Sequence, residues 1–120
     1  MTLRWNSGEK MAKKNIYETD AVKAFVNGMS AVSQRKYRLA RQLLAEVGYL
    51  RYPAAEKVEG YDNLFAIRIL TPGNERLFYC YEVGDFVLVL HGYAKRTKRI
   101  PPTELQTALK VKAELLGGST

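Results

Sequence analysis

The fold is decided by residues 64–96, which read LFAIRILTPGNERLFYCYEVGDFVLVLHGYAKR. Alternating branched and aromatic residues predict three strands in this stretch, over 64–70, 76–83 and 86–90. Turn residues at 71–75 separate the first two strands, and the Gly84-Asp85 pair suits a two-residue hairpin turn between the last two. The stretch is therefore predicted to form a three-stranded antiparallel meander.

Two helices are predicted ahead of this meander, after a short strand over 16–19. Asp20 can cap the first helix, which ends near Gly28. Ser30 can cap the second helix, and Gly48 can end it. The apolar stripe that we expect this second helix to turn inward comprises Val32, Leu39, Leu43, Leu44 and Val47. The two helices would then form a hairpin.

The segments on either side of the meander differ in character. Residues 49–63 are predicted to be an irregular connection, because Pro53 and Gly60 interrupt any period. After the meander, Thr103-Glu104-Leu105-Gln106 fits a capping box that opens a last helix, which Gly117-Gly118 ends.

This element order predicts a small α+β domain over residues 16–117. Its expected architecture is an antiparallel sheet with an N-terminal helical hairpin and a C-terminal helix. Residues 1–15 show no sustained period, which predicts a flexible N-terminal arm.

Composition excludes several classes of protein. A length of 120 residues with 47% hydrophobic content fits one domain. One Cys and one His cannot build an internal disulfide or a usual zinc site, so we expect no metal and no cofactor. No stretch approaches the roughly 20 apolar residues that span a bilayer, and there is no apolar signal core, so we expect a cytoplasmic protein with no membrane contact.

The charge of the chain favours an anionic partner. There are 19 Lys and Arg residues against 12 Asp and Glu, a formal net charge of +7, which attracts polyanions and nucleic acid above all. The densest run of positive charge comprises Lys95, Arg96, Lys98 and Arg99. Arg38 belongs to a basic face of the second predicted helix, which a solvated helix surface explains better than a binding site does. General RNA binding through this helix is one alternative function.

Residues that suit cleavage of RNA lie on the predicted strands. RNA can be cut by its own 2′-hydroxyl, so a protein needs only to position the phosphate, neutralise its charge and move protons. The forked guanidinium groups of Arg68 and Arg76, on neighbouring strands, suit a phosphate but do not act as bases. Lys95 and His91 are the candidate bases. Tyr93 would either stack on a base of the RNA or donate a proton to the leaving oxygen.

Structural roles account for the same residues. Arg68 and Arg76 can pair with nearby carboxylates such as Glu75 or Glu82. A single His at the end of a strand is structural more often than catalytic. Cys80, in the middle of a predicted strand, is most simply a core residue.

Three segments in a fixed order carry a resemblance to a known family: LFAIRI at 64–69, ERLFY at 75–79 and VLHGYAKRT at 89–97, followed by Pro101 and the last helix. With them the chain, from about Ile16 to Leu116, resembles the HigB branch of the RelE/ParE toxin superfamily, to which phage-derived toxin-like proteins are related. The resemblance implies the RelE-like, microbial-RNase-like fold.

The resemblance also implies a function. A protein of this kind is the toxin of a type II toxin–antitoxin system, a ribosome-dependent mRNA endonuclease held silent by a cognate antitoxin, which we expect to be a helix-turn-helix DNA-binding protein. The residues expected to be catalytic are Arg68, Arg76, His91, Lys95 and Arg96. Those expected to bind RNA are Tyr93, Lys98, Arg99 and Arg38.

One residue departs from the family pattern. Ala66 stands where HigB-like relatives commonly carry Glu and RelE-like ones Lys, so a base or orienting group is missing there. Proton transfer would then depend on Lys95 or His91. The ParE branch shares the fold but acts on gyrase without cutting RNA, so a non-catalytic gyrase inhibitor or partner-binding relative is the alternative.

Overall fold

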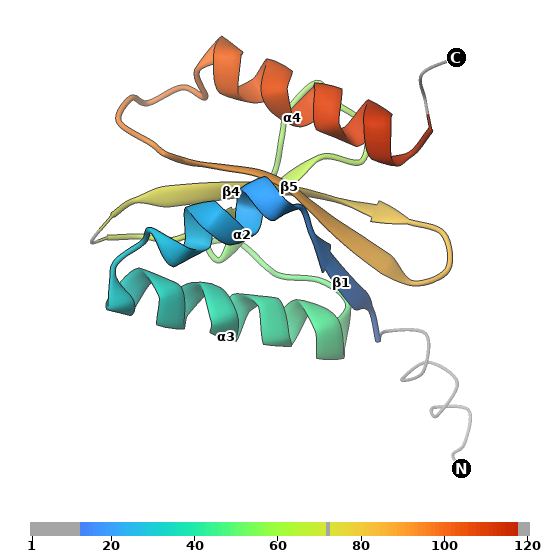
Figure 1. Cartoon of the computed structure of the whole chain (residues 1–120), viewed down its shortest axis with the longest axis horizontal. Helices are drawn as coiled ribbons and strands as arrows, with labels where there is room; N and C mark the ends of the chain where they lie inside the picture. The colour runs from blue at the N-terminus through green and yellow to red at the C-terminus, as the bar shows by residue number, and fades with distance from the viewer. Residues whose placement is uncertain (1–12, 72, 118–120) are drawn as a thin grey trace.

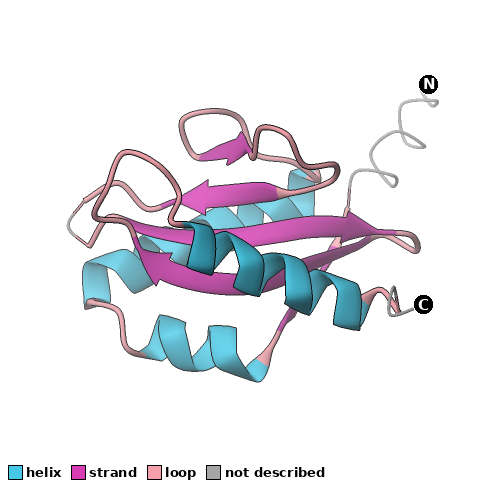
Figure 2. Ribbon diagram, turned by 90° about the horizontal axis from the view of Figure 1, so that it is seen from above, coloured by secondary structure: helices cyan, strands magenta, loops and turns pink. Residues whose placement is uncertain are grey.

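The computed structural model describes residues 13–71 and 73–117, and its centre is a five-stranded sheet with the strand order β1-β5-β4-β3-β2. The strands are β1 (Asn15–Glu18), β2 (Ala55–Lys57), β3 (Phe65–Arg68), β4 (Glu75–Glu82) and β5 (Phe86–Ala94). The helices are α2 (Asp20–Asn27), α3 (Ala31–Val47) and α4 (Pro102–Leu115). Helices α2 and α3 lie on one side of the sheet and α4 on the other (Figure 1). Seen from above, α4 lies in front of the sheet and runs roughly along its strands (Figure 2).

The expected α+β class is confirmed, and the sheet is mixed. The β3–β4 and β4–β5 pairings are antiparallel, as predicted, and β2, which was not predicted, also pairs antiparallel with β3. Strand β1 instead runs parallel to β5, with Ile16 opposite Val87. A tight hairpin forces its two strands to be antiparallel, but the long connection from β1 to β5 leaves either direction open. The antiparallel prediction therefore holds for four strands and not for β1.

The connection over 49–63 contains a strand that its sequence does not reveal. Strand β2 has only three residues, which pair with β3. Such a short strand offers no alternation to detect, and its position depends on the pairing with β3 rather than on local sequence.

The β4–β5 hairpin is confirmed, with a loop one residue longer than predicted. Glu82 pairs with Phe86, which leaves Val83, Gly84 and Asp85 between the strands. Gly84 and Asp85 have φ values of 83° and 68°. These left-handed conformations are ones that Gly and Asp tolerate better than most residues.

The caps of the first two helices agree closely with the sequence. The Thr19 side chain, rather than that of Asp20, caps α2 by accepting a hydrogen bond from the Val22 N–H at 3.0 Å. Ser30 caps α3, as predicted, and Gly48 ends it at a φ of 96°. Each helix thus begins within one residue of its predicted start.

Helix α4 begins differently from the prediction. Pro101 is the N-cap, Pro102 is in the first turn, and no side chain caps the helix. The predicted capping box at 103–106 does not form. Pro lacks an N–H and its φ already suits a helix, so Pro102 can occupy the first turn without a capping partner.

The prediction of which α3 residues face inward is largely wrong. Of its five residues only Leu44 is buried, and Leu39 remains 60% exposed. The helix instead buries Ser33, Tyr37 and Leu44 against the sheet. The rest of the stripe forms an exposed apolar surface on α3, which we call the α3 surface and which comprises Val32, Leu39, Leu43 and Val47.

The two faces of the sheet contribute to separate clusters of buried residues. One face packs against α2 and α3, and we call it the hairpin face; its strand residues include Ile67, Leu77, Tyr79, Val87 and Val89. The other packs against α4, and we call it the α4 face; its strand residues include Ala66, Phe78, Cys80, Leu88 and Leu90. The predicted alternation along β3 and β4 is therefore confirmed, and both sides of the sheet are buried.

Some predictions concern residues that the structure does not describe. Of the predicted arm over 1–15, residues 1–12 are not among the described residues, whereas Asn15 begins β1. Pro72 and Gly118 also lie outside the described ranges. Within residues 13–71 and 73–117, no helix combines the length and the apolar character needed to cross a membrane.

Candidate functional site

Three side chains form a row across one end of the α4 face. Arg68 of β3 lies opposite Arg76 of β4, and Arg76 lies opposite Tyr93 of β5. Residues directly opposite on neighbouring strands share a face, with Cβ atoms about 5 Å apart. We call Arg68, Arg76 and Tyr93 the arginine row. The structure thus brings together three of the residues that the sequence singles out.

Arg76 is a buried cation, and none of the ion pairs among the described residues includes it. Only 4% of the residue is exposed. Its Nη1 donates to Asn74 Oδ1 at 3.2 Å and to the Glu75 carbonyl oxygen at 3.1 Å. Burial, together with the neighbouring charge of Arg68, lowers the Arg76 pKa from its ordinary value. A buried guanidinium costs several kcal/mol unless an anion balances it, so an anionic ligand would stabilise this arrangement.

Arg68 is held at the edge of the row by contacts with the segment before β2. Its Nη1 donates to the Pro53 carbonyl oxygen at 3.0 Å. Its Cζ lies 4.7 Å from the centroid of the Tyr52 ring, in a cation–π contact. Its Nε lies 3.9 Å from Glu56 Oε2, an ion-pair distance but too long for a hydrogen bond.

The row contains three buried polar atoms that lack a hydrogen-bond partner. In the described part of the chain these are Arg68 Nε, Arg76 Nε and the Tyr93 hydroxyl. Buried polar groups are almost always paired, so three unpaired ones in a single row indicate a place for a ligand. Because two of them are guanidinium donors, the chemistry favours an anion such as phosphate.

Tyr93 is better placed to donate a proton than to stack on a base. The residue is only 5% exposed, and its ring stacks on Phe78 at a centroid distance of 5.7 Å. These contacts leave little ring surface for a nucleobase. Burial raises the pKa of Tyr93 to about 12, so its hydroxyl keeps its proton near neutral pH.

A second row lies next to the arginine row on the same face. Glu56 lies opposite Ala66, Ala66 opposite Phe78, and Phe78 opposite His91. Its two ends therefore carry a carboxylate on β2 and an imidazole on β5. The described residues contain no group of three metal-ligating side chains.

His91 is tied to α4. Its Nε2 lies 2.6 Å from Glu104 Oε1, and its ring is parallel to that of Phe78 at a centroid distance of 6.4 Å. One ring nitrogen is thus already engaged by a carboxylate. This contact joins β5 to the first turn of α4 and leaves Nδ1 as the ring nitrogen that Glu104 does not engage.

Gly92 lies between His91 and Tyr93 on β5 but belongs to the hairpin face of the sheet, where α2 packs on β5. A Cβ at this position would lie 2.5 Å from Cδ2 of Phe25. The absence of a side chain therefore lets α2 pack directly on β5, while the residues on either side of Gly92 face the candidate site.

The basic run begins next to the arginine row but leads away from the sheet. The Lys95 N–H donates to the Asn74 carbonyl oxygen at 3.0 Å, and Asn74 Nδ2 donates to the Lys95 carbonyl oxygen at 3.0 Å. Asn74 thereby links Lys95 to Arg76. The remaining cations of the run, Arg96, Lys98 and Arg99, are exposed beyond the end of β5, and none of the contacts among the described residues joins their side chains to the row.

Arg38 is not part of this site. It lies on α3, which covers the hairpin face, and its Nη1 donates to Gln34 Oε1 at 3.4 Å. The sheet separates it from the arginine row (Figure 1). The structure thus brings Arg68, Arg76, Tyr93 and His91 to one face and leaves Arg38 on the other.

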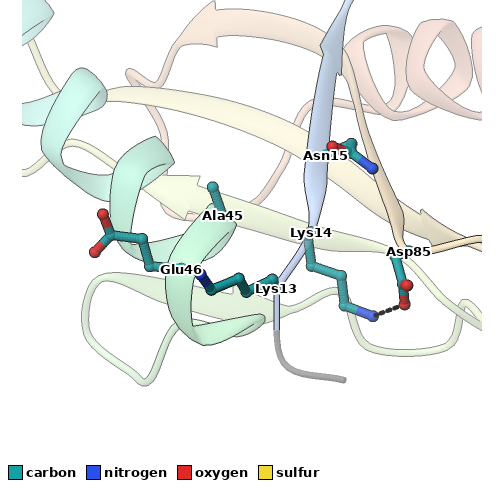
Figure 3. A pocket seen from close by; sticks show the side chains of 6 residues that line it. All are labelled: Lys13, Lys14, Asn15, Ala45, Glu46 and Asp85. Atoms are coloured by element: carbon teal, nitrogen blue, oxygen red, sulfur yellow. Dashed lines mark ion pairs between the residues drawn. The ribbon is translucent and has the colours of Figure 1, made fainter. Parts of the chain in front are cut away.

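A hollow of about 330 Å³ lies at the opposite end of the β4–β5 hairpin and is separate from the site (Figure 3). Its lining includes Lys14 and Asp85, whose charges are paired at 3.6 Å. The pairing leaves no excess charge on those two residues to attract an anion.

Sequence reasoning missed three residues of the site: Tyr52, Glu56 and Glu104. The first two lie in the connection that was predicted to be irregular, and Glu104 was expected only to form part of a cap. Their proximity to the arginine row depends on the β2–β3 register and on the packing of α4. No local pattern around Tyr52 or Glu56 would have revealed it.

Comparison with known proteins places the chain in a family. The family model described as phage-derived protein, Gp49-like, matches residues 24–113, which include both rows and the basic run. The chain belongs to the Gp49-like family.

A solved structure confirms the fold of this Gp49-like chain. The present chain is similar to a chain of the archaeal RelE–RelB complex from Pyrococcus horikoshii OT3, with a TM-score of 0.54 and 16% sequence identity. The similarity covers 69% of this chain and 94% of the other. At this identity the likeness concerns the fold, and the expected RelE-like fold is confirmed. A search of curated protein sequences finds no match.

Proposed function

We propose that this Gp49-like protein is the toxin of a type II toxin–antitoxin system and that it cleaves mRNA on the ribosome, as members of the HigB branch do. The observation that carries the proposal is the arginine row, in which two guanidinium Nε atoms and one phenol hydroxyl are buried and find no hydrogen-bond partner within residues 13–71 and 73–117. A phosphodiester offers these donors the acceptors that the protein itself does not provide.

The row suits attack by a 2′-hydroxyl on the adjacent phosphate. Arg68 and Arg76 would bind the non-bridging oxygens and stabilise the charge that grows on them in the transition state. Tyr93, which keeps its proton, would donate to the 5′-oxygen as that oxygen leaves.

Residues around the row would hold the rest of the message. Tyr52 is 70% exposed, and one face of its ring is covered by Arg68, so the other face is available to a nucleobase. Lys95, Arg96, Lys98 and Arg99 would bind phosphates further along the strand. The protein would act in the cytoplasm, where its ribosomal substrate lies.

A cognate antitoxin is part of the proposal. The similar archaeal structure is a RelE–RelB complex, which supports the expectation that the present chain also has a partner protein. Leu39, Leu43 and Val47 of the α3 surface follow one another at four-residue spacing, are exposed, and lie on the other side of the sheet from the arginine row. Neighbouring exposed apolar residues of this kind are typical of protein interfaces. We expect the partner to be a helix-turn-helix protein encoded next to this chain.

Induced expression followed by mapping of mRNA ends tests the function. The expected result is growth arrest with breaks inside translated codons. Arg76→Ala should abolish both while the protein still folds, because losing one such contact costs about 2–4 kcal/mol of transition-state stabilisation. Lys110→Ala removes an exposed charge from α4 and should leave cleavage intact.

Two outcomes would contradict the proposal. Full toxicity of Arg76→Ala would remove the arginine row from the mechanism. Intact messages accompanied by DNA-damage signalling would favour the gyrase-directed alternative that the shared fold allows.

A further inference from the structure

The structure places a carboxylate beside the arginine row where the sequence offered none. Glu56 of β2 lies directly opposite Ala66, so its side chain is on the same face as Arg68. Its Oε2 is 3.9 Å from Arg68 Nε, and its side chain is 34% exposed. The pKa values of both Arg76 and Tyr93 respond to its charge. Among the residues of the two rows, Glu56 is the one acidic side chain.

The strand order puts the Glu56 carboxylate and the Tyr93 hydroxyl on opposite sides of a bound phosphate. In an in-line displacement, the attacking and leaving oxygens lie on opposite sides of phosphorus. Strands β3 and β4, which carry the two arginines, lie between β2 and β5. Neighbouring strands are about 4.8 Å apart. A phosphate held by Arg68 and Arg76 therefore has Glu56 on one side and Tyr93 on the other.

The other two candidate bases are less well placed. His91 lies on β5, on the same side of the arginines as Tyr93, and its Nε2 is engaged by Glu104. Lys95 lies beyond the end of β5, also on that side, and a Lys must first lose its proton to act as a base. A carboxylate is already deprotonated near neutral pH.

We propose that Glu56 is the general base of the reaction, an inference that rests on the proposed function. Its carboxylate takes the proton of the attacking 2′-hydroxyl as the 2′-oxygen forms its bond to phosphorus. The bond from phosphorus to the 5′-oxygen breaks, and the Tyr93 hydroxyl gives its proton to that oxygen. The products are a 2′,3′-cyclic phosphate and a 5′-hydroxyl end. A proton then passes through water from Glu56 to Tyr93, which restores both groups.

The test measures single-turnover cleavage by the purified full-length protein on ribosomes programmed with a short mRNA. Glu56→Gln keeps the shape of the side chain but cannot accept the proton, so the rate should fall by about 10²- to 10⁴-fold. Glu56→Asp keeps a carboxylate at a shorter reach and should retain intermediate activity. Glu59→Gln, on an exposed residue three positions away, is the matched control and should cleave at the wild-type rate.

Two further readouts separate a base from a residue that only holds Arg68 in place. In the wild type the rate should rise with pH to a plateau, and this acid limb should disappear in Glu56→Gln. Binding of a message whose cleavage-site 2′-hydroxyl is replaced by hydrogen should change less than about threefold in Glu56→Gln, because a base contributes to the chemical step rather than to binding.

The outcomes distinguish this inference from the proposed function. A Glu56→Gln protein that keeps the wild-type rate and acid limb, while Arg76→Ala is inactive, overturns the role of Glu56 and leaves the nuclease in place. An equal loss of message binding and of cleavage in Glu56→Gln also overturns it, because that result assigns Glu56 to positioning. A wild-type protein that cleaves no translated message overturns both proposals.

Discussion

The hairpin face and the α4 face of the sheet are built from alternate residues of the same strands, yet they bury different chemistry. Leu77 and Arg76 are neighbours on β4 and are 0% and 4% exposed. Leu77 packs among apolar side chains, including Ile67 and Tyr79, whereas Arg76 has a guanidinium Nε without a partner. Burial of Leu77 stabilises the fold, but burial of Arg76 opposes it. Both faces bury an apolar cluster, and the α4 face also holds, at one end, a buried charge that is ready for a ligand.

The largest expected effect on stability comes from the hairpin face. Leu77→Ala should lower the free energy of unfolding by about 2–5 kcal/mol, because it leaves a cavity in a closely packed core. Below its unfolding temperature the variant should still cleave mRNA, since Leu77 does not face the arginine row. Urea titration together with the cleavage assay checks both statements. A loss below about 1 kcal/mol would show that the hairpin face is not the stabilising layer.

A smaller effect is expected at Gly92, on the hairpin face, where α2 packs on β5. In Gly92→Ala the added Cβ meets the Phe25 ring, which should cost about 1–3 kcal/mol of stability through overpacking. Combining it with Phe25→Ala removes the obstacle, so the double variant should lose less than the sum of the single losses. Additive losses in this double-mutant cycle would contradict the proposed contact.

The smallest expected effect distinguishes the two faces by pH. Burial raises the pKa of Tyr93, on the α4 face, to about 12, and it raises that of Tyr79, on the hairpin face, still further. The folded protein then holds these protons more tightly than the unfolded chain, whose Tyr residues titrate near about 10. Stability is therefore full below about pH 10 and falls as the pH rises toward 12.

Burial also raises the pKa values of Tyr37 and Tyr81, so these residues contribute to the alkaline loss too. Phe substitutions compare the shares of Tyr79 and Tyr93. Tyr79→Phe should make the fall in unfolding free energy shallower than Tyr93→Phe does, when both are measured by urea titration at a series of pH values. If the unfolding free energy falls equally with pH in the two variants, burial raises the pKa values of Tyr79 and Tyr93 by the same amount.

Local patterns predicted most of the fold. Alternation along β3 and β4 assigned the residues to faces correctly, and the Ser30 and Gly48 signals marked the ends of α3. The same kind of pattern misjudged which side of α3 is buried. Apolar residues such as Leu39 are spaced for a helix, but tertiary packing selects Tyr37 for the interface instead.

The site was predicted only in part, for a related reason. The meander alone placed Arg68 and Arg76 on neighbouring strands, but the predicted turn over 71–75 would put Leu70 opposite Arg76, so the observed register was not predicted. Glu56 and Glu104 reach the site through the register of a three-residue strand and through the docking of α4, and neither leaves a local signal. Residues that are brought together by long-range contacts are those that single-sequence reasoning misses.

If the charge of Arg76 is retained for a ligand and not for stability, removing it should not weaken the fold. Arg76→Met tests this through its free energy of unfolding, measured by urea titration without RNA and accompanied by the cleavage assay. Met is unbranched and uncharged, so we expect a protein at least as stable as the wild type that no longer cleaves mRNA. A loss of about 3–5 kcal/mol, as when one partner of a buried ion pair is removed, would instead make Arg76 a structural residue.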